Sequence, residues 1–130
     1  MSKSAIYSAT TVPQTIAAGG AVSLGQTVHK CGCGIESNDG RILLHGTGYY
    51  SVTITMSVTP AAAGDVTLTL MQDGIAVPGA VTIVNSTTAK GATIEAIVRI
   101  VCPRNANSVL TVVSDTAASV LAVSAVVERL

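Results

Sequence analysis

The sequence contains no tryptophan and no phenylalanine, and its aromatic residues other than histidine are three tyrosines. Charge is scarce as well, because charged residues make up 11% of the 130 residues, against about 25% in an ordinary soluble domain. The core must therefore be built from valine, isoleucine, leucine and alanine. A surface with so little charge offers little resistance to association, so we expect partner subunits to cover much of it.

The seven lysines and arginines are balanced by seven acids and are scattered along the chain, so nucleic-acid binding has no electrostatic footprint. No run reaches the roughly 18 consecutive apolar residues of a membrane span, and the N-terminus lacks the hydrophobic centre of a signal peptide. Three cysteines do not make a disulfide framework. We expect synthesis in a reducing cytosol, with neither nucleic acid nor a membrane as partner.

The clearest pattern is an unbroken period of two between Gly48 and Pro60, which predicts a β-strand with one apolar face. The apolar parity holds Tyr50, Val52, Ile54, Met56 and Val58, and the hydroxyl parity holds Ser51, Thr53, Thr55, Ser57 and Thr59. Threonine, valine, isoleucine and tyrosine all favour strands, so propensity and pattern agree. We expect this strand to organise the domain.

Further short apolar runs are separated by turn signals, about 8 to 12 residues apart. The sequences Asn38-Asp39-Gly40 and Gln72-Asp73-Gly74 predict tight turns, and Pro78-Gly79 predicts a type II turn between two strands. The chain length fits one domain. We predict an all-β fold, a single-domain antiparallel jelly-roll sandwich of about eight to ten short strands over residues 21–130. Residues 1–20 are expected to form an N-terminal arm that lies along a neighbour.

The final strand, from Val120 to Val127, is apolar on both parities. One row holds Leu121, Val123, Ala125 and Val127, and the other holds Val120, Ala122 and Val126. A strand that is apolar on both faces is buried on both faces. In a two-layer sandwich one face meets the core, so we expect the other to meet a second subunit.

Three segments resemble the C1q/TNF-like jelly rolls, in their bacterial spore-surface and phage versions. The sequence Gly48-Tyr49-Tyr50-Ser51-Val52 is similar to their Gly-x-Tyr-x-aliphatic strand, and the stretch from Leu68 to Ala80 is similar to their Leu-x-Leu hairpin with its Asp-Gly turn. The segment from Leu121 to Leu130 resembles their closing strand. The likeness covers roughly residues 20 to 130, without the several aromatics of the animal members and without a collagen-like repeat.

The resemblance implies a homotrimer in which one sheet of each subunit packs around a three-fold axis. The hydroxyl parity of the Gly48–Pro60 strand would then face the axis, together with one apolar row of the final strand. The expected interface residues are Tyr49, Ser51, Thr53, Thr55, Val120, Ala122 and Val126, with the alternate row of the final strand left open.

The spacing His29-x-Cys31-x-Cys33 places three metal-ligating residues at alternate positions, with His45 or Cys102 as a conceivable fourth. Structural zinc sites usually use Cys-x-x-Cys, so free thiols are the favoured interpretation. A Cys31–Cys33 disulfide would close a small strained ring. Neither histidine lies in a recognisable catalytic motif. We therefore expect no enzyme activity, no cofactor and no metal.

A small head without a stalk or an export signal looks most like a phage virion protein assembled in the host bacterial cytoplasm. The first hypothesis is a trimeric capsid decoration or accessory protein, bound to other virion (capsid) proteins through the N-terminal arm. The alternative is the receptor- or glycan-binding head of a tail or baseplate fibre protein. Sugar sites favour exposed aromatics for stacking, and only Tyr7, Tyr49 and Tyr50 exist, so the structural hypothesis leads.

Overall fold

The computed structural model describes residues 4–61, 64–85, 88–100 and 107–130, and within them the chain forms strands and no helix. The strands are β1 (Ala5–Thr10), β2 (Gln14–Ile16), β3 (Ala21–Val22), β4 (Gln26–Cys31), β5 (Ile35–Asn38), β6 (Arg41–His45), β7 (Gly48–Pro60), β8 (Asp65–Gln72), β9 (Ile75–Asn85), β10 (Lys90–Ile100), β11 (Asn107–Ser114) and β12 (Ala118–Arg129).

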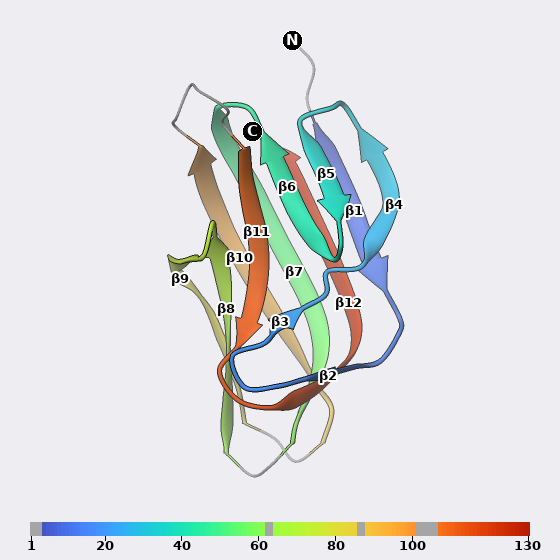
Figure 1. Ribbon diagram of the computed structural model, residues 1–130, viewed down its shortest axis with the longest axis vertical. Helices are drawn as coiled ribbons and strands as arrows, with labels where there is room; N and C mark the ends of the chain where they lie inside the picture. Colours follow the sequence, from blue (N-terminus) through green and yellow to red (C-terminus); the bar gives the residue numbers. More distant parts are fainter. Residues whose placement is uncertain (1–3, 62–63, 86–87, 101–106) are drawn as a thin grey trace.

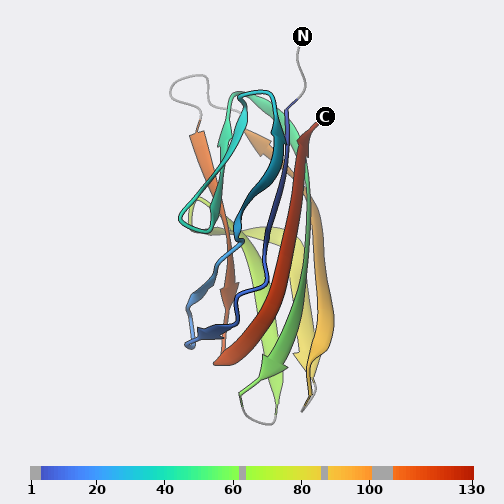
Figure 2. The ribbon, with the colours of Figure 1, turned by 90° about the vertical axis from the view of Figure 1, so that its right-hand side faces the viewer.

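The strands form two antiparallel sheets that face one another (Figures 1 and 2). The β7 sheet has the order β10-β7-β12-β1-β4, with β2 paired to β12, and the β11 sheet has the order β5-β6-β11-β8-β9, with β3 paired to β11. This arrangement confirms the predicted antiparallel jelly-roll sandwich. The described residues hold more strands than expected because short pieces such as β2 and β3 pair separately.

Strand β7 has the predicted bounds and lies between β10 and β12 in the middle of its sheet. Its apolar parity points into the sandwich, where the exposed fractions of Tyr50 to Val58 do not exceed 2%. Its hydroxyl parity points to the other side of the sheet. The alternation in the sequence therefore positions one face in the core and leaves the opposite face for function.

The core between the sheets is almost entirely aliphatic, as the absence of phenylalanine and tryptophan requires. Leu68, Leu70, Leu110 and Val112 of the β11 sheet lie opposite the β7 row, and all are 0% exposed. Burying aliphatic side chains in this way contributes about 25 cal/mol per Å² of apolar surface. Ser8 is the polar group deepest in this layer, and its hydroxyl donates a 2.7 Å hydrogen bond to the carbonyl of Leu24.

Two predicted hairpin turns are present, and a third predicted turn is not. Asp39 and Asp73 adopt positive φ angles of 52° and 54°, as tight hairpins after β5 and β8 require. Pro78-Gly79 was expected to separate two strands, but β9 runs through it from Ile75 to Asn85. The register with β8 shifts between Thr69 and Met71, so Gly79, with φ of 79°, belongs to a bulge rather than to a turn.

The first residues differ from the expected arm. Strand β1 pairs with β12 on one side and β4 on the other, so it is an interior strand of its own chain's sheet. Ile6 is 2% exposed and belongs to the core. Strand β1 ends at Thr10, and after Pro13 the short strand β2 pairs with the start of β12. Residue 20 is therefore not a structural boundary between an arm and the domain.

Candidate functional site

The side of the β7 sheet that faces away from the sandwich is called the outer face here. It is built from the outward parity of five strands, and its members include Ala5, Tyr7 and Ala9 of β1, His29 and Cys31 of β4, Tyr49, Ser51, Thr53 and Thr55 of β7, Glu95, Ile97 and Arg99 of β10, and Leu121, Ala122, Ser124, Val126 and Glu128 of β12. Small, hydroxyl and apolar side chains occupy its centre. Its charges lie mainly on edge strand β10 and toward the chain's C-terminus.

One row crosses the whole outer face. Strand pairing aligns Glu95 with Thr53, Thr53 with Val126, Val126 with Tyr7, and Tyr7 with His29. The rings of Tyr7 and His29 stack with their centroids 6.5 Å apart and their planes at 21°. Val126 is 43% exposed and Tyr7 is 39% exposed. The centre of the face therefore presents apolar surface to its surroundings although it lies in the middle of a sheet.

Strand β12 contains a bulge that changes the predicted interface. Its register with β7 shifts between Val120, which pairs with Val58, and Val123, which pairs with Met56. Leu121 and Ala122 therefore lie opposite a single residue of β7, Ser57, as in a β-bulge. Val120 is 0% exposed and points into the core, so its predicted place on the outer face is wrong. Leu121, from the alternate row, is 44% exposed instead. Ala122 and Val126 keep the outward orientation that the sequence predicted.

The bulge and the small residues around it leave a shallow hollow of about 390 Å³ on the outer face. Its walls include Tyr7, Ala9, Thr55 and Ala122, and Gly91 contributes no side chain. Most of this lining is apolar or carries a hydroxyl group, and none of it is ionisable apart from the Tyr7 phenol. Such a hollow suits an aliphatic side chain of a partner better than a charged group.

At the end of the sheet where β7 begins, Tyr49 and Tyr50 have opposite environments. Tyr49 is 50% exposed on the outer face, and the guanidinium carbon of Arg99 lies 5.4 Å from the centroid of its ring. Tyr50 is 0% exposed, as parity predicted, and its hydroxyl donates to the carbonyls of His45 and Gly46 at 3.0 and 2.9 Å. Burial raises the pKa of the Tyr50 phenol, and the nearby Arg129 guanidinium offsets part of that rise.

A second apolar surface lies across the molecule, where β9 and β10 form neighbouring edges of the two sheets. Ile75 is 73% exposed, and Ile83 is 62% exposed. Val81 adds to the same strand at 44%. We call these three residues of β9 the β9–β10 edge patch. It was not predicted.

The candidate metal ligands are spread over three segments. His29 and Cys31 lie on β4, Cys33 follows in the connection to β5, and both of these cysteines are exposed. His45, on β6, has its Nε2 atom 3.5 Å from a carboxylate oxygen of Glu36. Cys102 lies outside the described residues. Within the ranges that the structure describes, no three His, Cys, Asp or Glu side chains form a group able to hold a metal ion.

Among the described residues, there is also no helix with the length and hydrophobicity needed to cross a membrane.

Comparisons with known proteins support the fold and not a specific function. No family model matches the chain, and no curated protein does. Solved structures do match. Murine APRIL is 14% identical with a TM-score of 0.75, over 99% of this chain and 100% of that one. PRD1 vertex protein P5 is 20% identical with a TM-score of 0.65, over 98% and 96%. The globular domain of zebrafish complement 1qA is 10% identical with a TM-score of 0.63, over 97% and 94%.

These neighbours confirm the resemblance to the C1q/TNF-like jelly rolls at the level of the fold. The likeness extends over nearly the whole chain, including β1, which the sequence motifs from about residue 20 onward did not cover.

Proposed function

We propose that this protein is a structural component of a phage virion, a homotrimeric decoration or accessory protein of the capsid, with no enzymatic role. The observation that carries the proposal is the outer face of the β7 sheet, which presents Tyr7, Leu121 and Val126 at exposed fractions near 40% in a chain with only 11% charged residues. Apolar surface of this kind marks interaction sites.

The positions of the two apolar surfaces favour a ring over a two-fold dimer. The outer face spans the β7 sheet, whereas Ile75, Val81 and Ile83 of the β9–β10 edge patch lie on the edge of the other sheet. A two-fold dimer joins one patch to its own copy, whereas contact between two different patches generates a closed ring when the rotation between neighbours closes, and an open filament when it does not. Packing the edge patch of one subunit on the outer face of the next covers both surfaces. The resemblance selects three subunits.

The choice of a virion rests on the likeness to PRD1 vertex protein P5, which matches this fold over 98% of the chain. That neighbour is a vertex protein by name, which favours a virion component assembled in the host bacterial cytoplasm. Other virion proteins would be reached through the part of residues 1–20 that remains exposed. Thr11, Val12 and Pro13 satisfy this condition, because they leave the sheet after β1.

Sedimentation equilibrium tests the assembly. Across the micromolar range we expect a mass three times the 13.0 kDa of the chain. A mass of one chain throughout that range would contradict the trimer, and a mass of two chains would contradict the ring.

Antibody labelling of purified virions tests the location. We expect label distributed over the head. Label confined to the tail tip would contradict the decoration role and support the alternative, a receptor- or glycan-binding head of a tail or baseplate fibre protein. Virions without label would contradict both roles.

A further inference from the structure

The hollow of about 390 Å³ on the outer face lies beside the β12 bulge, and we call it the outer-face hollow. Its lining includes Thr55 and Met56 of β7, Gly91 of β10, and Ala122 and Ser124 of β12. Gly91 has no side chain and Ala122 has only a methyl group, so a larger side chain has room to enter from outside. The space therefore suits an aliphatic side chain of a second molecule.

One residue of the β9–β10 edge patch lies at the level of this hollow along the strands. The hydroxyl of Thr82, on β9, donates to the carbonyl of Thr93 on β10 at 2.5 Å. Thr93 in turn pairs with Thr55, which lines the hollow. Ile83 directly follows Thr82 and is 62% exposed. Because successive residues of a strand differ in level by about 3.3 Å, Ile83 and the hollow lie at nearly the same height.

The other exposed isoleucine of the edge patch lies at a different level. Ile75 pairs with Gln72, whose side-chain amide donates to the carbonyl of Arg99 at 3.1 Å. Arg99 pairs with Tyr49 near the beginning of β7. At about 3.3 Å per residue, Tyr49 and Thr55 are about 20 Å apart along the strand. Ile75 is therefore far above or below the hollow, whichever end of the molecule is taken as the top.

Cyclic symmetry determines which of these levels can meet. A rotation leaves every atom at its original height along the rotation axis, and the subunits of a closed ring are related by rotations. The outer face extends along the strands, and its whole length packs around a three-fold axis when the axis runs in the same direction. Residues that touch across neighbouring subunits then lie at equal heights. Ile83 meets this condition for the hollow, and Ile75 does not.

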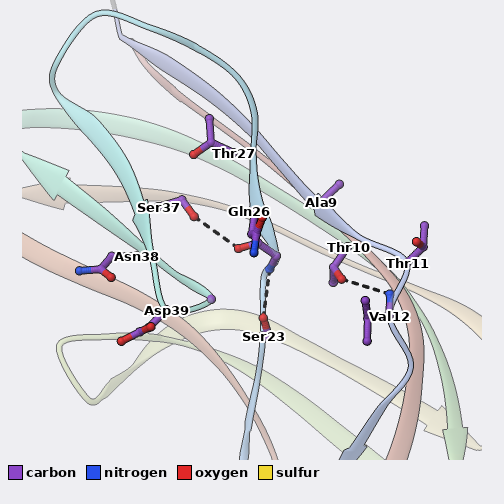
Figure 3. A pocket seen from close by; sticks show the side chains of 12 residues that line it. Ala9, Thr10, Thr11, Val12, Ser23, Gln26, Thr27, Ser37, Asn38 and Asp39 are labelled. Atoms are coloured by element: carbon purple, nitrogen blue, oxygen red, sulfur yellow. Dashed lines mark hydrogen bonds between the residues drawn. The ribbon is translucent and has the colours of Figure 1, made fainter.

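A larger hollow, of about 660 Å³, lies at the edge of the sandwich where β1 ends and β4 begins, and it does not suit an isoleucine. Most of its lining residues carry polar side chains. Figure 3 shows Ser37 reaching across it, where the Ser37 hydroxyl donates to the carbonyl of Gly25 at 3.4 Å. Part of that space is therefore taken by a side chain of the same molecule.

We infer that Ile83 of each subunit inserts into the outer-face hollow of the next subunit. The inference rests on the proposed ring and adds the residues that form its contact. The lining of the hollow has no ionisable group apart from the Tyr7 phenol, so closing it off from water strands no charge. An aliphatic side chain seated in such a pocket is typical of the anchors that carry much of an interface's affinity.

Exchanging the sizes of the two partners tests the contact. Ile83→Ala leaves the hollow empty and should weaken subunit affinity by about tenfold or more. Ala122→Leu fills the hollow, so that Ile83 no longer fits, and should weaken affinity by a similar factor. The double variant Ile83→Ala, Ala122→Leu keeps the total volume and should bind about tenfold more tightly than Ala122→Leu alone. Sedimentation of dye-labelled chains, from nanomolar to micromolar concentration, measures the dissociation of each variant.

The matched control is the double variant Ile75→Ala, Ala122→Leu, which removes the isoleucine at the other level. It should bind no more tightly than Ala122→Leu alone, because Ile75 does not enter the hollow. All three substituted positions are exposed in the single chain, and an unchanged circular dichroism spectrum verifies the fold of each variant.

The contact would be overturned, with the trimer intact, if either single variant kept the wild-type affinity. It would also be overturned if the Ile83→Ala, Ala122→Leu variant bound no more tightly than Ala122→Leu, or if the Ile75→Ala control recovered affinity equally well. A wild type that sediments as single chains would instead contradict the proposed trimer, and the contact with it.

Discussion

Tyr50 shows how one buried polar atom is accommodated in an aliphatic core. Its ring lies at 0% exposure and fills the end of the sandwich, while its hydroxyl reaches the carbonyls of His45 and Gly46. Those two bonds fasten the connection between β6 and β7. The phenolate form would lose the donor and leave a charge beside two carbonyl oxygens, which agrees with a pKa raised by burial.

The contribution of Tyr50 should be visible in how the free energy of unfolding changes at alkaline pH. Because the folded state holds the Tyr50 proton to a higher pH than the unfolded chain, whose pKa is near 10.0, the stabilisation is complete below that pH and is lost as the pH rises through the folded pKa. Tyr50→Phe should lower the free energy of unfolding by about 1 kcal/mol at neutral pH. It should also show a shallower decline above about pH 10. Urea unfolding at several pH values measures both.

Tyr7→Phe is the matched control, because the Tyr7 ring is exposed on the outer face. It should change the free energy of unfolding at neutral pH by no more than about 0.5 kcal/mol. A Tyr50→Phe variant with the wild-type alkaline slope would show that the Tyr50 phenol does not contribute to the pH dependence.

The backbone just before β4 passes very close to β1. Gly25 has a φ angle of 86°, and a Cβ there would lie 2.3 Å from the backbone of Ala9. Gly79, in the β9 bulge, has nearly the same φ, 79°, with nothing within 4 Å of the added atom. Alanine substitutions at Gly25 and Gly79 therefore separate the cost of a positive φ angle, which both share, from the cost of steric overlap, which applies to Gly25 alone.

We expect Gly79→Ala to reduce the free energy of unfolding by about 1–2 kcal/mol, the cost of a left-handed conformation for an L-residue. Gly25→Ala should cost that amount and about 1–3 kcal/mol more, because β1 and β4 must move apart. Urea midpoints for both variants provide the comparison. Equal urea midpoints for the two variants would mean that the backbone segments at Gly25 and Ala9 can move apart without a loss of stability.

Elements with strict alternation were predictable, and irregular ones were not. Strand β7 was predicted with its bounds and orientation because one parity is apolar and the other carries hydroxyls. Strand β12 is apolar on both parities, so the sequence contains no mark of the bulge that turns Val120 inward and Leu121 outward. Strand β1 was taken for part of an arm because Pro13 breaks the short apolar pieces of residues 1–20, although the strand already ends at Thr10.

Among the candidate sites, too, the parts built on one regular strand were predictable and the parts assembled from several segments were not. Tyr49, Thr55 and Val126 were placed on one face by parity along single strands, and they lie there. Whether that face meets other subunits stays a prediction. A hollow of about 660 Å³ is lined by residues of three segments, 9–12, 23–27 and 37–40, which come together only in the complete fold. The alternation of apolar and polar residues along one strand could not indicate it.

At the scale of the molecule, low charge and two separate apolar surfaces point to the same assembly. The chain has no net charge to keep copies apart, and its outer face and β9–β10 edge patch lie on different sheets. A ring in which each edge patch meets the next subunit's outer face leaves neither surface in water. The centre of the outer face would then lie close to its symmetry copies.

A carboxylate at that centre should therefore prevent assembly. Thr55 is the best position, because strand pairing places it between Thr93 and Ser124, whereas Thr53 faces Glu95 and would add repulsion within one chain. Thr55→Glu brings like charges of three subunits together, at a cost of several kcal/mol. Its subunit affinity should fall by about a hundredfold or more at neutral pH. Thr55→Gln, of the same size without the charge, should remain trimeric. Light scattering on the two variants decides the matter, and a trimeric Thr55→Glu would place the three-fold axis on a different surface.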